Sequence, residues 1–100
     1  MSHPADGGGG VVTQRDLDAS LALRRRARDA AAEARECHRQ LARRLSAGEA
    51  SEPGRYRAEV ARVRYGLPPG EESVLLGVYD SEALGPYPIV TAAFDPEELA

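Results

Sequence analysis

Cys37 and His38 have the side chains best suited to nucleophilic or metal chemistry in this sequence. A Cys–His nucleophilic pair needs the base within hydrogen-bonding reach of the thiol, and a zinc site needs several clustered ligands. Neighbouring residues of a helix point about 100° apart, so these two side chains cannot share one proton or one ion. We therefore expect Cys37 to be a small buried residue and His38 a polar border residue. The sequence predicts no catalytic residue, no metal, no cofactor and no enzyme activity.

Acidic residues gather near the C-terminus. If the segments 73–79 and 88–94 are antiparallel strands, the loop before the first and the tail after the second lie at one end of the sheet. That end suits a divalent cation or a basic partner, and the alternative is a solvated surface paired with Arg. Its residues are Glu71, Glu72, Asp95, Glu97 and Glu98.

A stripe of arginines recurs at helical spacing and is the candidate for phosphate contacts. Against nucleic-acid binding, the net charge is -3, acidic residues share the same segment, and no aromatic residue is interleaved for base stacking. The alternative is a solvated face with ion pairs such as Glu36–Arg39. The stripe consists of Arg24, Arg28, Arg35 and Arg39.

The segment that must position these residues reads as one long helix over 13–47. Thr13 is an expected N-cap with Asp16 three residues on, and Gly48 supplies the stop. A straight helix of this length spans roughly 50 Å, whereas a chain of this size folds to a diameter of about 35 Å. The helix therefore breaks near 21–26, protrudes, or is covered by another subunit.

An apolar seam runs along this helix at a spacing close to a heptad, which is typical of a coiled coil. Small side chains in its middle allow close approach of a second helix, from the same chain or from a second copy. We take this seam as the candidate partner interface: Leu23, Ala27, Ala30, Ala34, Cys37, Leu41 and Leu45.

The remainder of the chain is predicted as a loop over 48–54, a second, shorter helix over 55–66, and a β-hairpin with an acidic tail over 67–100. The 55–65 segment is ambiguous, because its apolar residues fit a helical period and also begin as a strand alternation. If 55–65 is a strand, the sheet has three strands. The fold class is α+β in either case.

The amino-acid composition limits the classes of protein to which this chain can belong. Residues 1–12 form a Gly-rich tail expected to be disordered, and 13–100 form a single domain. A lone Cys excludes an intrachain disulfide, and neither a leader nor an apolar run of membrane-spanning length is visible, so we expect a cytoplasmic protein. All basic residues are Arg, which indicates the coding bias of high-GC bacteria.

These observations favour a small non-catalytic protein–protein interaction or assembly protein, a homodimer or the subunit of a larger assembly, that buries the seam in its partner. One alternative is a nucleic-acid-associated regulator that uses the Arg stripe. The other is a small metal-binding protein or enzyme that uses the acidic end. Contact with a membrane is not expected.

Overall fold

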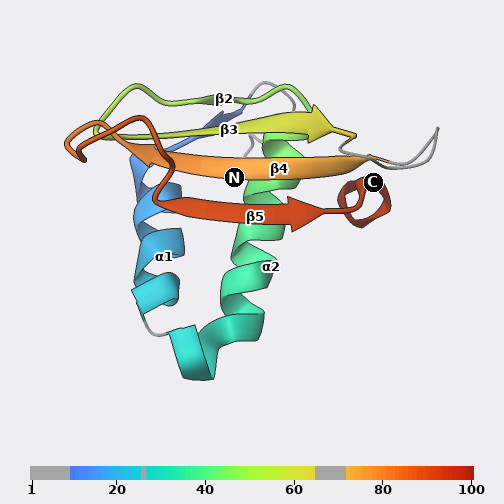
Figure 1. The fold of residues 1–100 in the computed structure, drawn as a ribbon, viewed down its shortest axis with the longest axis horizontal. Coiled ribbons are helices and arrows are strands. Elements are labelled where there is room, and N and C mark those ends of the chain that lie inside the picture. Colours follow the sequence, from blue (N-terminus) through green and yellow to red (C-terminus); the bar gives the residue numbers. More distant parts are fainter. Residues whose placement is uncertain (1–9, 26, 65–71) are drawn as a thin grey trace, which may run out of the picture.

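The computed structural model describes residues 10–25, 27–64 and 72–100, and its described side chains exclude those of residues 24–30. The described elements are a helical hairpin packed on one face of a three-stranded antiparallel sheet, so the α+β class is confirmed (Figure 1). Residues 1–9 of the expected disordered tail over 1–12 lie outside these ranges. The predicted tail is too long, because Val11 and Val12 form a short strand and Val12 is fully buried.

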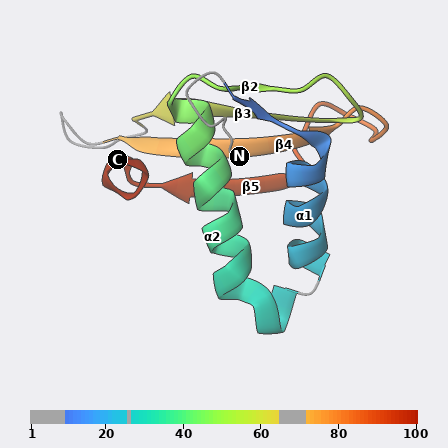
Figure 2. The same cartoon turned by 180° about the vertical axis from the view of Figure 1, so that it is seen from behind.

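The segment predicted as one long helix is two helices. Helix α1 covers Gln14–Arg25 and helix α2 covers Ala27–Ser46, and the two lie side by side as a hairpin (Figures 1 and 2). The prediction of a continuous helix over 13–47 is therefore wrong, and its alternative of a break near 21–26 is confirmed. Folding back lets both helices bury their apolar sides against one small sheet, which a straight helix cannot do.

The ends of the helical segment follow the sequence signals. The Asp16 N–H donates to the Thr13 hydroxyl oxygen, and the Thr13 N–H donates to the Asp16 carboxylate, so the predicted capping box is present. At the far end Gly48 has a φ of 104°, the left-handed conformation that ends a helix at low cost only with glycine.

The prediction of a second helix over 55–66 is wrong. Strand β3 (Tyr56–Val63) pairs antiparallel with β4 (Ser73–Asp80), which pairs antiparallel with β5 (Val90–Phe94), giving the order β3-β4-β5. The three-stranded alternative is thus confirmed. A strand here has a physical advantage, because a lone β4–β5 hairpin leaves one edge of β4 without backbone partners. Two short strands, β1 (Val11–Val12) and β2 (Ala50–Ser51), pair in parallel beside β3.

The core lies between the helices and the inner face of the sheet. Alternate residues of β4 and β5 point into it, as the period of a strand requires. Its largest fully buried apolar side chains are Val12, Leu17, Val74, Leu76, Val78, Val90 and Phe94.

The Gln14 side chain joins α1 to β3. Its amide nitrogen donates to the carbonyl oxygens of Glu52 (3.2 Å) and Tyr56 (2.8 Å), and its amide oxygen accepts from the Tyr56 N–H (3.1 Å). The amide therefore takes the place of a neighbouring strand at this point of β3. Gly54 leaves the space, because a Cβ there would lie 2.5 Å from the Gln14 side chain.

Replacing Gln14 with alanine is expected to lower the free energy of unfolding by about 1–3 kcal/mol, because part-buried backbone groups of Tyr56 and Glu52 lose their partners. Urea unfolding measures the change. Gln40→Ala is the matched control: Gln40 is exposed and donates to Glu36 on the helix surface, so its loss should cost under about 0.5 kcal/mol. Equal losses in the two variants would contradict this role.

Candidate functional site

The described part of the apolar seam packs within its own chain. Ala34 and Leu41 are buried, Leu45 packs against the core, and Cys37 is half-buried. Leu23 is partly buried, while the side chains of Ala27 and Ala30 lie outside the described set. From Ala34 onward, the seam is used to hold α2 against α1 and the sheet.

The thiol and the imidazole lie in this packed region. Burial raises the pKa of Cys37, the charge of Asp16 raises it further, and the neighbouring Ser20 hydroxyl opposes them only in part. The thiol therefore stays protonated near neutral pH, which disfavours a nucleophilic role. His38 is buried rather than a border residue, so that expectation is wrong; the helical hairpin encloses this position.

The described arginines of the stripe bind their own C-terminal segment. Arg35 contacts the Glu98 carboxylate at 2.9 Å and lies 4.5 Å above the centre of the Phe94 ring. Arg39 donates to the Glu98 carbonyl oxygen (2.9 Å) and pairs with Glu36 (2.7 Å), as predicted for that pair. Both arginines thus hold the short 3₁₀ helix η1 (Pro96–Leu99) against α2. The side chains of Arg24 and Arg28 are not among those described.

The acidic end is only partly assembled. Glu72 and Asp95 sit at the same end of the sheet, as predicted, but Glu72 pairs with Arg62 at 2.9 Å and Glu98 turns toward α2. Glu97 is exposed, and Glu71 lies outside the described residues. Within the described ranges, no three His, Cys, Asp or Glu side chains are grouped to hold a metal ion.

Several carboxylates have a lowered pKa in the folded chain. Hydrogen bonds from Arg39 and then Gln40 lower the pKa of Glu36 to about 2. The Asp95 N–H and Arg35 lower the pKa of Glu98, and Arg55 and the Glu82 N–H lower that of Asp80. Burial raises the pKa of Asp16, but the Thr13 N–H and Arg44 outweigh it.

Acid is expected to destabilise the chain through these groups. Because their folded pKa lies below the unfolded value, their stabilisation is complete above the unfolded pKa and is lost as the pH falls through the folded one. The free energy of unfolding should be level near neutral pH and fall between about pH 4.5 and about pH 2 for Glu36. Urea unfolding across this range measures it. Glu36→Gln should flatten the slope, and a slope identical to that of the original chain would contradict the assignment.

The two edges of the sheet differ. The Ser81 N–H donates to the Arg55 carbonyl oxygen, and this bond shows which way the backbone groups of β4 point. The N–H and C=O groups of its odd-numbered residues point toward β3, and those of its even-numbered residues point toward β5. On the outward edge of β3, the Gln14 amide binds the N–H and C=O of Tyr56, and the Ser51 hydroxyl oxygen accepts from the Ala58 N–H (3.2 Å).

The β5 edge is open in the described part of the chain. The same alternation directs the backbone groups of Thr91 and Ala93 away from β4. The Ala93 carbonyl oxygen receives two long contacts of 3.5 Å from Arg35, and no described hydrogen bond reaches the other outward groups. The sequence marked 88–94 as a strand, but it gave no signal that this strand is an edge.

Within the described ranges, no helix is long and apolar enough to span a membrane. No protein family, curated protein or solved structure matches the chain.

Proposed function

We propose that the protein is a non-catalytic protein–protein interaction protein that self-associates by pairing the β5 edges of two copies. The observation that carries the proposal is the contrast between the edges: side chains bind the outward backbone groups of β3 at Tyr56 and Ala58, whereas on β5 the only described bonds to outward groups are the two long ones from Arg35 to the Ala93 carbonyl oxygen. An open, uncharged edge strand is a template for another strand, and proteins normally block such edges. The segment Val90–Phe94 contains neither a charge nor a proline that would block it.

The pairing register follows from which residues face outward. With Ala92 at a twofold axis, the Thr91 N–H donates to the Ala93 carbonyl oxygen of the second copy, and the Ala93 N–H donates to its Thr91 carbonyl oxygen. The twofold axis generates the same pair in the opposite direction, as in any isologous contact. On the inner face this register sets Val90 opposite Phe94 of the second copy, which continues the apolar core across the contact.

The helical hairpin supplies the second part of the contact. Both helices cross the sheet and continue beyond β5 (Figure 2). Arg35 reaches β5, and Ala31 lies one turn earlier on the same side of α2, where it is exposed. A helical turn rises about 5.4 Å and strands lie about 4.8 Å apart, so Ala31 would lie at the contact, beside α2 of the second copy, which already covers the inner face of its own β5.

This arrangement revises the predicted interface without discarding it. The positions Leu23, Ala27 and Ala30 belong to the projecting half of the hairpin, so this part of the seam would lie beside the helical hairpin of the second copy. A small side chain at each Ala position suits such a contact. We place the assembly in a reducing bacterial cytoplasm, in agreement with the lone Cys and the Arg-only basic residues.

Light scattering on a sizing column tests the proposal, with Thr91→Pro as the decisive variant. Proline removes the outward N–H of an edge strand, a position where a sheet tolerates it, so the monomer should keep its fold. The original chain should elute as a dimer, and Thr91→Pro should raise the dimer dissociation constant by about tenfold or more. Thr91→Val keeps the N–H and should remain dimeric.

A second pair of variants tests the helical part. Ala31→Arg should dissociate the dimer, whereas Ala32→Arg, on a neighbouring exposed position that points away from this side, should not. Circular dichroism verifies that each variant is folded. A monomeric original chain at high concentration, or a dimer that tolerates both Thr91→Pro and Ala31→Arg, would overturn the proposal.

A further inference from the structure

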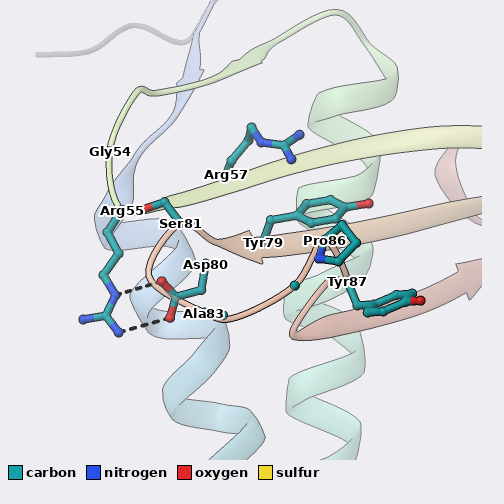
Figure 3. A pocket seen from close by; sticks show the side chains of 10 residues that line it. Gly54, Arg55, Arg57, Tyr79, Asp80, Ser81, Ala83, Pro86 and Tyr87 are labelled. Atoms are coloured by element: carbon teal, nitrogen blue, oxygen red, sulfur yellow. Dashed lines mark hydrogen bonds and ion pairs between the residues drawn. The ribbon is translucent and has the colours of Figure 1, made fainter.

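A cavity of about 490 Å³ lies at the end of the sheet where β3 begins and β4 ends (Figure 3). The turn that joins β4 to β5 forms its lower wall, and Gly85 in that turn has a φ of 87°. Cavities of this size accommodate small ligands or a few side chains of a peptide. The site lies outside the contact proposed for self-association.

Two tyrosines, Tyr79 and Tyr87, line the cavity. The Tyr79 ring lies along its strand over Gly77, where a Cβ would come within 3.0 Å of the ring, and Arg57 stacks 4.4 Å from the ring centre. Tyr87 is 79% exposed and follows Pro86 in the turn. No described hydrogen bond involves either tyrosine hydroxyl, so both remain able to donate to a ligand.

The charged side chains around the cavity are already paired with one another. Arg55 pairs with Asp80 at 3.0 Å and with Glu82 at 3.4 Å, and Arg57 pairs with Glu59 on its own strand. Three carboxylates thus accompany two guanidinium groups, which disfavours an anionic ligand. The ligand that fits is uncharged, with flat apolar surface for the rings and carbonyl oxygens for the hydroxyls.

We propose that the cavity binds a proline-rich extended segment of a partner protein. Proline rings pack on tyrosine faces, and a polyproline helix presents unpaired carbonyl oxygens at its surface. Aromatic-lined grooves recognise such segments in this way, and the rigid segment loses little conformational entropy on binding. Tyr87 supplies the exposed ring for proline packing. Tyr79 supplies its hydroxyl, because Gly77 and Arg57 already flank its ring, and Gly77 positions Tyr79.

Titration of the ¹⁵N-labelled protein with a decaproline peptide tests the proposal by NMR. Saturable shifts should be confined to residues that line the cavity, and a Gly-Ser decamer of equal length should cause none. Tyr87→Ala should weaken binding by about tenfold, and Tyr87→Phe, which keeps the ring, by less. Because Tyr87 is exposed, neither variant should unfold the chain.

Two further measurements separate the alternatives. Gly77→Val should displace the Tyr79 ring and weaken decaproline binding while the chain stays folded, and Thr91→Pro should leave binding unchanged whatever its oligomeric state. Inorganic phosphate should not shift the cavity residues. Absence of saturable shifts at millimolar decaproline, equal shifts with the Gly-Ser decamer, unaltered affinity in Tyr87→Ala, or saturable phosphate binding at this cavity would overturn the proposal.

Discussion

Replacing Phe94 with alanine is expected to lower the free energy of unfolding by about 3–5 kcal/mol. The Phe94 ring is 1% exposed, so the substitution opens a cavity where β5 meets the helices. It also removes the surface on which the Arg35 guanidinium stacks. A domain of this size has only about 5–15 kcal/mol of stability, so the variant should be only marginally folded at room temperature.

Urea unfolding at one fixed protein concentration measures the Phe94 effect, since self-association shifts apparent stability. Tyr87→Ala provides the control: it also removes an aromatic ring, but one that is 79% exposed, and it should cost under about 1 kcal/mol. If Phe94→Ala cost no more than Tyr87→Ala, β5 would not be packed on the helices as described.

Local signals predicted the ends of elements well. Thr13 and Asp16 form their capping box, and Gly48 ends α2 in a left-handed conformation. Each of these depends on residues at most three or four positions apart. For that reason, these element ends can be predicted from a single sequence.

Pairings between distant segments were harder to predict. Tyr56 and Val60 fit a helical period with Val63 and a strand alternation with Ala58. The outcome depends on β4, which lies further along the chain and needs a partner on that edge. Likewise, nothing near Arg26 is a helix breaker such as Gly or Pro. The return of the chain at that point follows from the limited size of the sheet that the helices must cover.

In the candidate sites, too, contacts between near neighbours in the sequence were predictable and contacts between distant residues were not. The pairing of Glu36 with Arg39 was readable from its spacing, and it is present. The contacts of Arg35 and Arg39 with Glu98 join residues about sixty positions apart, so the sequence showed an unpaired stripe and an acidic tail instead. The Tyr79 site needed the structure, because Arg57 and Tyr79 meet only through the register of β3 and β4.

Replacing Leu17 with alanine distinguishes the hairpin from a continuous helix. In one straight helix Leu17 lies off the apolar seam, on the Arg side, and its truncation would cost little. In the hairpin Leu17 is 0% exposed and belongs to the core between α1, α2 and the sheet. The substitution is therefore expected to lower the free energy of unfolding by about 2–5 kcal/mol.

Leu84→Ala is the matched control for this measurement, because Leu84 is fully exposed in the turn between β4 and β5. The same methylene groups are removed in both variants, so the difference between them measures burial alone. Urea unfolding should give a loss under about 0.5 kcal/mol for Leu84→Ala. A comparably small loss for Leu17→Ala would mean that α1 does not fold back, and the projecting hairpin proposed to contact a second copy would then not exist.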